Sequence, residues 1–263
     1  MRITTFNANG IRSAARKGFF DWFADHGADV LCIQETKAQD AQLQDSVFRP
    51  EGYHCYYCDA EKKGYSGTAI LSRREPDRVQ YGLGWEAADS EGRYLQADFG
   101  RLSVISLYMP SGSSGEVRQA FKFEFLDRFL PLLKRFRADG REYVICADWN
   151  MCHKPIDLKN WRANQKNSGF LPEERAWLDT LYDKVGYVDS FRLVNQQPEQ
   201  YSWWSNRGQA RARNVGWRLD YHVITPGLVP AVKAASIYTD AFFSDHAPVT
   251  LDLDAGLVSV DTK

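Results

Sequence analysis

The chain has 263 residues, and 33 lysines and arginines against 34 aspartates and glutamates give a formal net charge of -1. Hydrophobic residues make up 44% and charged residues 25%, which are ordinary values for a soluble globular protein and exclude disordered, collagen-like and disulfide-scaffold classes. The near-zero charge alone argues against a protein coated in positive charge for nucleic acid.

Short apolar runs that each border a polar residue recur along the chain. The clearest are Ile3–Phe6, Val30–Ile33, Tyr143–Ala147, Tyr221–Ile224 and Pro248–Leu253, and further strands are predicted at Thr68–Ser72, Tyr94–Phe99 and Leu102–Leu107. Gly100-Arg101 predicts a tight hairpin between the last two. Strand ends of this kind form the rim of a cleft in α/β sheets.

Helices are predicted between these runs. They cover Lys17–Asp25, Val117–Arg137 and Glu173–Val185. Helical spacing of apolar residues predicts the first two, and a proline with acids in the first turn predicts the third. We expect two packed sheets with outer helices in a single domain over residues 1–254, followed by a short tail at 255–263.

The five cysteines form an odd set with irregular spacing, which favours the cytoplasm as the compartment. Neither a signal peptide nor an apolar run long enough to span a membrane is visible, so no membrane association is expected. Cys55 and Cys58 match C-x-x-C and leave a zinc or redox role open, although no second pair follows.

Seven polar residues lie at the ends of the predicted strands. They are Asn7, Glu35, Asp148, Asn150, Asp220, Asp245 and His246. Each alone could be a cap or a turn residue, but carboxylates that converge in a cleft repel one another, and a hard cation such as Mg²⁺ relieves this repulsion. Asp148 and Asn150, two apart on a strand, would share a face and could together accept a water's proton and donate to an oxyanion.

His246 has two interpretations. It is either a hydrogen-bonded structural histidine or a titratable group whose tautomer is held by a carboxylate such as Asp220.

Charge is unevenly distributed. Residues 153–218 carry 11 basic against 7 acidic residues, a local excess of +4, and the rest of the chain carries -5. Within this segment a stretch without acidic residues holds four arginines interspersed with three tryptophans, namely Arg207, Arg211, Arg213, Arg218, Trp203, Trp204 and Trp217. Such a pattern is either a solvated face or a nucleic-acid surface, and the tryptophans favour the second.

The segments that carry these residues resemble the exonuclease III family. They are Phe6–Arg12, Gln34–Lys37, Gly64–Gly67, Ala147–Asn150, Asn214–Tyr221 and Ser244–Pro248, and they span nearly the whole chain. This family contains the apurinic/apyrimidinic (AP) endonucleases of base excision repair, within the endonuclease/exonuclease/phosphatase superfamily.

The resemblance implies a fold and a reaction. The fold is a four-layered α/β sandwich of the deoxyribonuclease I-like kind. The reaction is Mg²⁺-dependent hydrolysis 5′ to an abasic site, with Mn²⁺ as a possible substitute, together with some 3′-5′ exonuclease and 3′-phosphatase activity. The substrate would be double-stranded DNA with abasic sites or blocked 3′ ends, and the protein a monomer.

The resemblance also implies roles for individual residues. Glu35 matches the main metal ligand, with Asn7 and Asp245 near it. Asp148 and Asn150 match the residues that hold the attacking water. Tyr108 and His246 match the residues that contact the phosphate, and Asp220 supports His246. Trp203, Trp217 and Leu219 match an apolar pocket for an extrahelical abasic sugar, and Arg12, Lys37, Asn164, Asn167 and Arg207 match DNA contacts.

Three positions depart from the family pattern. Asn9 stands where some relatives have an aspartate. Small residues occupy Ser111–Ser114, where other members carry a bulky side chain. Trp149 stands where a smaller residue is common, and we expect it to serve packing. Arg207 is a candidate for the wedge inserted into DNA.

Three rival functions remain open. They are a member acting mainly as a 3′ exonuclease or 3′-phosphatase, a catalytically silent binder of damaged DNA, and a lipid or inositol-phosphate phosphodiesterase. Gly169 favours the AP endonuclease, because a small residue there could leave room for continuous DNA.

Overall fold

The computed structural model describes residues 1–258, which fold around two six-stranded β-sheets. The first sheet has six strands in the order β13 (Val232–Ile237), β14 (Val249–Leu253), β1 (Arg2–Asn7), β2 (Val30–Gln34), β4 (Thr68–Ser72) and β3 (His54–Cys58). The second has six in the order β5 (Arg78–Tyr81), β6 (Tyr94–Phe99), β7 (Leu102–Tyr108), β8 (Glu142–Asp148), β12 (Asp220–Ile224) and β9 (Val188–Asp189). In these sheets β1–β2 and β7–β8 pair in parallel and the other pairs are antiparallel.

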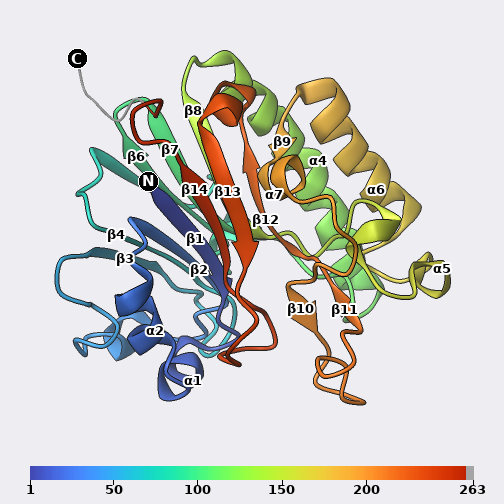
Figure 1. The fold of residues 1–263 in the computed structure, drawn as a ribbon, viewed down its shortest axis with the longest axis horizontal. Coiled ribbons are helices and arrows are strands. Elements are labelled where there is room, and N and C mark those ends of the chain that lie inside the picture. Colours follow the sequence, from blue (N-terminus) through green and yellow to red (C-terminus); the bar gives the residue numbers. More distant parts are fainter. Residues whose placement is uncertain (259–263) are drawn as a thin grey trace.

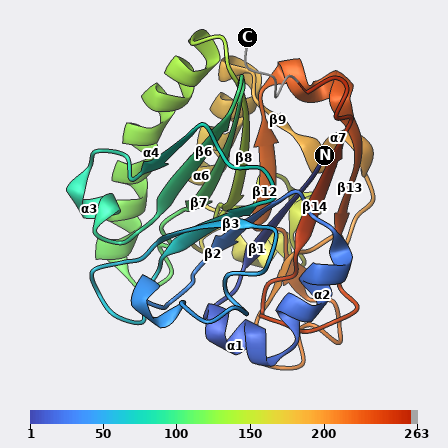
Figure 2. The same ribbon diagram turned by 90° about the vertical axis from the view of Figure 1, so that its left-hand side faces the viewer.

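Helices cover the outer face of each sheet, so the molecule has four layers (Figure 1). The helices are α1 (Ile11–Arg16), α2 (Phe19–His26), α3 (Glu86–Asp89), α4 (Glu116–Ala138), α5 (Trp161–Asn164), α6 (Pro172–Asp179) and α7 (Ser190–Val194). Short 3₁₀ turns cover Asp40–Gln42, Pro155–Asp157 and Pro226–Ala231, and a π-helical turn covers Thr180–Val185. Figure 2 shows α1 and α2 beside the first sheet and α4 and α6 beside the second. The predicted four-layered α/β sandwich is confirmed.

The central strands are buried on both faces, which explains why they read as continuous apolar runs. In β8, Val144 and Cys146 point between the sheets, whereas Ile145 and Ala147 point toward α4. Side chains alternate along a strand, so the last residue, Asp148, returns to the space between the sheets.

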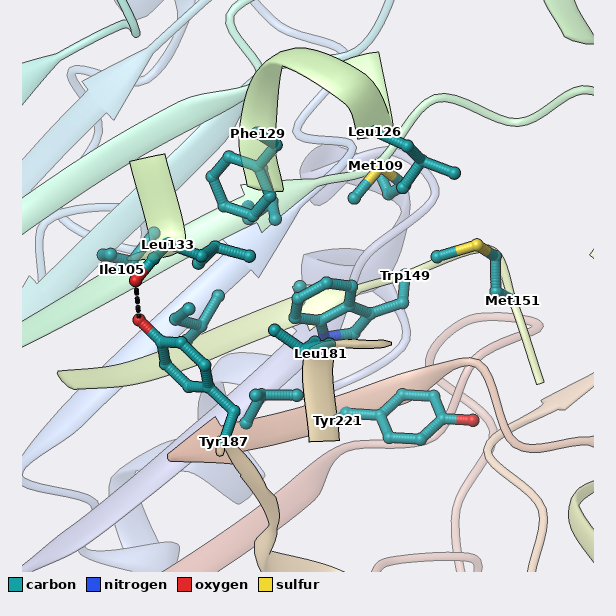
Figure 3. Close-up of a cluster of buried hydrophobic side chains, with 14 of the residues drawn as sticks. Ile105, Met109, Leu126, Phe129, Leu133, Trp149, Met151, Leu181, Tyr187 and Tyr221 are labelled. Carbon is teal, nitrogen blue, oxygen red and sulfur yellow. Dashed lines mark hydrogen bonds between the residues drawn. The ribbon is translucent and has the colours of Figure 1, made fainter. Parts of the chain in front are cut away.

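The outer layers are held by aromatic side chains. Phe19 of α2 stacks on Phe6 of β1 with ring centroids 4.2 Å apart. On the other side, Trp149 is fully buried with Phe129 of α4 and with Leu181 and Tyr221, as Figure 3 shows. Trp149 therefore serves packing, as predicted.

All eight predicted strands are present, and two of the three predicted helices differ in their bounds. The helix predicted at Lys17–Asp25 is α2, which begins only at Phe19, because Lys17 caps the end of α1 and Gly18 adopts a φ of 82° that separates the two helices. The helix α1 was not predicted. The helix at Glu173–Val185 is α6 followed by the π-helical turn. The hairpin at Gly100-Arg101 is confirmed by the pairing of Phe99 with Leu102.

The C-x-x-C pair lies in β3, and its two thiols point in opposite directions. Cys55 packs under the outer helices, whereas Cys58 packs between the sheets. Burial raises the pKa of each thiol to about 11. Neither feature suits zinc binding or redox exchange.

The tail predicted at 255–263 is only partly described. Val258 is 4% exposed and packs into the core between the sheets, and residues 259–263 lie outside the described part. Across residues 1–258, the helices are too short or too polar for any of them to cross a membrane.

Candidate active site

Strand pairing brings the predicted polar residues to one edge of the sandwich. Tyr108 of β7 and Asp220 of β12 both pair with Asp148 of β8, and Asn7 of β1 pairs with Gln34, the residue before Glu35. Because Asp148 faces the other sheet, residues from both sheets meet there.

Asn7 joins the two principal carboxylates. Its Nδ2 lies 2.8 Å from Glu35 Oε1 and 2.8 Å from Asp148 Oδ2, and donates to both. Burial raises the pKa of Asp148 to about 7, and the nearby charges of Asp220 and Glu35 add to the effect although His246 opposes it. A carboxyl group with this pKa suits a general base near neutral pH.

Glu35 is held in its charged form. It lies in a left-handed turn with φ 52°, and Lys37 Nζ is 2.7 Å from its Oε2. Burial opposes ionisation, but Lys37 and the amide of Asn7 outweigh it and lower the pKa of Glu35. Lys37 also donates to Asn9 Oδ1, so this predicted DNA contact lies within the acidic cluster.

His246 and Asp220 form the predicted pair. His246 Nδ1 lies 2.8 Å from Asp220 Oδ2, and the same oxygen accepts a hydrogen bond of 2.6 Å from Ser202 Oγ. Burial disfavours the charged imidazole, but Asp220 and Asp148 outweigh it and raise the pKa of His246 to about 10. The imidazole is therefore cationic at neutral pH and its Nε2 faces Asp148 Oδ2 at 3.8 Å.

Asn150 reaches the site by a different route from the predicted one. The strand ends at Asp148, and Asn150 adopts a φ of 49°, so the two side chains are not successive members of one strand face. A tight turn brings them together: the Asn150 backbone nitrogen donates to Asp148 Oδ1 at 2.9 Å, and Nδ2 donates to Asp148 Oδ2 at 3.2 Å. Nδ2 also donates to the carbonyl of Met109.

Tyr108 lies beside Glu35 and remains protonated. Burial raises its pKa well above the ordinary value, and the charge of Glu35 adds to this. Arg93, which is 1% exposed, donates to the Tyr108 carbonyl at 2.8 Å and lies 4.6 Å from the centre of its ring. Sequence reasoning missed Arg93 and Ser202, which fix Tyr108 and Asp220.

One group among the described residues is suited to a metal ion. Atoms of Glu35, Asp148 and His246 lie within 4.8 Å of one another, and because the imidazole is cationic, the two carboxylates are the groups that can bind a metal. Burial is the main cause of the raised pKa of Asp148, and the charges of Asp220 and Glu35 add to it. Two carboxylates, those of Glu35 and Asp148, accept hydrogen bonds from one Asn7 amide, so the residues present fit an oxygen-bound metal.

The two other predicted ligands are placed less directly. Asn7 presents its amide nitrogen to the carboxylates, so its oxygen would face a metal only after the amide turns over. Asp245 is not part of the group of three in the described chain, and it accepts hydrogen bonds from Asn9 Nδ2 and Trp203 Nε1.

A pocket of about 690 Å³ opens over the acidic cluster. Trp203, Trp217 and Leu219 line it together with Glu35, Tyr108, Asp148, Asn150, Asp245 and His246. The two tryptophans pair across the short strands β10 (Trp203–Trp204) and β11 (Gly216–Trp217), and their rings meet edge to face, 6.4 Å apart. The predicted apolar residues and the predicted polar residues thus share one cavity.

Gly169 also lines the pocket, and we call it the floor of the pocket. It has φ 95°, and a Cβ there would lie 3.2 Å from both the Asn150 carbonyl oxygen and the Trp217 ring. Local packing therefore requires a glycine, so its small size does not by itself indicate room for continuous DNA.

The other predicted DNA contacts are spread around the pocket. Asn167 lines it and donates to Asn164 Oδ1 at 2.7 Å. Arg12, at the start of α1, and Arg207, in the β10–β11 loop, are exposed and do not line the pocket in the described chain. Lys166, which was not predicted as a contact, does line it.

Comparison with known proteins identifies the family. The pattern of the Endonuclease/Exonuclease/phosphatase family matches residues 4–246. The chain belongs to this family. An exodeoxyribonuclease of Bacillus subtilis is 41% identical over 253 residues, which cover 95% of this chain and 98% of that protein. The DNA repair nuclease APEX1 of Danio rerio is 41% identical over 256 residues, covering 96% and 82%.

Solved structures of the family have the same fold. An AP endonuclease from Archaeoglobus fulgidus superposes with a TM-score of 0.88 at 29% identity, covering 97% of this chain and all of that one. A 3′-5′ exonuclease from Neisseria meningitidis gives 0.86 at 26% identity, covering 97% and 100%. The resemblance to the exonuclease III family and its fold is confirmed.

Proposed function

We propose that this protein is a Mg²⁺-dependent AP endonuclease that cuts 5′ to an abasic site and leaves a 3′-hydroxyl and a 5′-deoxyribose phosphate. One observation carries the proposal: a single pocket joins a carboxylate–histidine cluster to an apolar wall of Trp203, Trp217 and Leu219. Relatives named as exodeoxyribonucleases and AP endonucleases over nearly the full chain support the wider statement that it is a DNA-hydrolysing enzyme.

Asp148 and Asn150 would hold the attacking water. Asp148 is buried with a pKa of about 7, and two amides, those of Asn7 and Asn150, donate to its Oδ2. These amides fix the carboxylate so that it can accept the proton of a water aligned with the phosphorus atom. Such positioned proton transfer typically contributes about 10²–10⁴-fold to a rate.

His246 and Tyr108 would bind the phosphate. The cationic imidazole, held by Asp220, offers its free Nε2 to a phosphate oxygen, and the protonated Tyr108 hydroxyl offers a second donor. Both groups are fixed before the substrate arrives, which is the condition under which charge stabilisation of a transition state is strong.

Glu35 would hold the metal, with Asp148 adjoining. Asn7 donates a hydrogen bond to Glu35, and Asp245 lines the same pocket. Bound there, Mg²⁺ would supply Lewis-acid stabilisation of the charge that develops on the phosphate oxygens. Lys37 keeps Glu35 ionised and so keeps it competent as a ligand.

The apolar wall would select the abasic sugar. A nucleotide without its base costs little to turn out of the helix, and a narrow apolar pocket favours a bare sugar over an intact nucleotide. Trp203 and Trp217 are half-buried and Leu219 is 7% exposed, so the wall is already formed without substrate.

Three oligonucleotides test this proposal: an abasic-site duplex, a duplex with a recessed 3′ end, and one with a 3′-phosphate, each with Mg²⁺, Mn²⁺ or EDTA. We expect fastest incision of the abasic duplex, dependence on the metal, and loss of activity in E35Q but not in the exposed control E51Q. Faster release of 3′ nucleotides or phosphate would favour the second candidate, a 3′-5′ exonuclease or 3′-phosphatase, the activities named for two structures of the Neisseria protein NExo, which has the same fold. We also propose that the protein acts as a monomer in the cytoplasm.

A further inference from the structure

A buried ion pair lies beneath the pocket, outside the groups discussed so far. Lys122 of α4 and Glu174 of α6 approach to 2.6 Å, and neither side chain is exposed. Burial lowers the pKa of Lys122, although Glu174 opposes the shift. Such a pair is costly to desolvate and persists only where further hydrogen bonds satisfy its remaining donors and acceptors. Those hydrogen bonds identify what the pair holds in place.

The lysine holds the turn that carries Asn150. Lys122 Nζ donates to the Asn150 carbonyl oxygen at 2.8 Å. Asn150 is in the left-handed region, with φ 49°, a conformation that needs support from its surroundings. This turn aims the Asn150 side chain at Asp148, so Lys122 fixes the geometry of the water-holding pair.

The glutamate holds the floor of the pocket. Glu174 Oε2 accepts hydrogen bonds from the backbone nitrogens of Gly169 at 2.7 Å and Leu171 at 3.0 Å. Gly169 packs against the Trp217 ring and the Asn150 carbonyl oxygen. The same carboxylate therefore places the loop against which the apolar wall rests.

A third contact extends to the 111–115 loop, which also lines the pocket. Gln119 Nε2 donates to Glu174 Oε1 at 3.2 Å, and a Cβ built on Gly112 would lie only 1.8 Å from Gln119 Oε1. Gly112 belongs to this loop. Three separate parts of the pocket thus depend on one buried cluster.

We propose that Lys122 and Glu174 are positioning residues that set the Asn150 carboxamide and the Gly169 loop for cleavage at an abasic site. The inference rests on the proposed function, because it concerns the rate of that reaction. Neither residue reaches the substrate, since both are fully buried. They act through Asn150, and a displacement of a reacting group by about 1 Å can cost about 10²-fold in rate.

The test is a double-mutant cycle with Asn150, measured as single-turnover cleavage of an abasic duplex with enzyme in excess. The double variant K122M/E174Q removes both charges together and avoids leaving one of them buried alone. We expect it to lose about 10- to 100-fold in the wild-type background and a clearly smaller factor when combined with N150A, because the part of the effect that passes through Asn150 is already lost there. The control is R141M/D98N, an ion pair between Arg141, the residue before β8, and Asp98 of β6, at the end of β8 away from Asp148, and it should leave the cleavage rate unchanged.

Each outcome decides the question. Equal losses in both backgrounds would show that the pair acts independently of Asn150 and would overturn the proposal, as would a wild-type rate in K122M/E174Q. If thermal unfolding shows that this variant does not fold, K122Q/E174Q, which carries no buried charge and keeps a hydrogen-bonding group at both positions, is taken through the same cycle and judged by the same two outcomes. If the wild-type protein does not cut the abasic duplex, the proposed function itself is refuted. This result is obtained before any variant is compared.

Discussion

The indole nitrogen of Trp203 donates a hydrogen bond of 3.1 Å to Asp245, so the apolar wall of the pocket and its acidic side are joined by a side-chain contact. Burial tends to keep Asp245 neutral, but His246 and the hydrogen bonds from Asn9 and Trp203 outweigh it and lower the pKa. Asp245 is therefore charged at neutral pH, which is the state a metal ligand needs.

Removing this contact while keeping an aromatic ring should weaken metal binding. We expect W203F to raise the Mg²⁺ concentration for half-maximal cleavage about tenfold, the effect typical of losing a hydrogen bond to a ligand. The measurement is a Mg²⁺ titration of abasic-duplex cleavage. The neighbouring W204F is the control, because Trp204 Nε1 bonds Asn214 and not an acid. Equal shifts in both variants would refute the role given to the contact.

Replacing Asp148 by asparagine should remove catalysis and spare the fold. We expect D148N to cleave about 10²–10⁴-fold more slowly, because the amide cannot accept the water's proton. Its melting temperature should not fall, because the carboxylate is buried among other acids and its pKa is raised to about 7. D127N, on the exposed face of α4, is the control. Near wild-type cleavage by D148N would exclude Asp148 as the base.

Much of this site follows from the sequence because its residues border buried strands. Once the runs that become β1, β8 and β12 are recognised, pairing brings Asn7, Asp148 and Asp220 to one edge without further information. The route of Asn150 could not be found in this way, since its left-handed turn depends on support from Lys122, which is distant in the chain.

Lys122 itself left a signal in the sequence. In α4 it stands at helical spacing from Leu126, Phe129 and Leu133, on the stripe that faces the sheet. A lysine on such a stripe must be paired when buried, which predicts an acid nearby but not which one. Glu174 lies 52 residues further along, and only the packing of α6 on the second sheet reveals it as the partner.

Gly169 and Gly186 form a matched pair for testing the floor of the pocket. Both have positive φ, 95° and 84°, but a Cβ at Gly169 meets Asn150 and Trp217, whereas one at Gly186 meets nothing within 4 Å. G186A should therefore cost only the backbone strain of about 1–2 kcal/mol. G169A adds a clash and should also slow cleavage of the abasic duplex by about tenfold or more. Chemical denaturation measures the stability cost in each variant, and single-turnover cleavage measures the rate. Equal rates for the two variants would show that the floor of the pocket does not control the reaction.

His222 should make the protein sensitive to acid. It is 1% exposed in β12, its Nε2 has no hydrogen-bond partner among the described residues, and burial lowers its pKa to about 3. The unfolded chain, with an ordinary pKa near 6.5, binds the proton first. The stability from the neutral ring is therefore complete above pH 6.5 and is lost as the pH falls from 6.5 toward 3.

The expected loss from His222 is roughly 2–3 kcal/mol between pH 7.5 and pH 4.5, at about 1.36 kcal/mol per pH unit below 6.5. Urea unfolding at several pH values measures it as the difference in slope between wild type and H222Q, whose amide does not titrate. H54Q, at the exposed end of β3, controls for the loss of an imidazole without burial. A wild-type slope that H222Q leaves unchanged would mean that His222 accepts a proton in the folded protein, and that its Nε2 has a partner, such as a buried water, that keeps its pKa near the ordinary value.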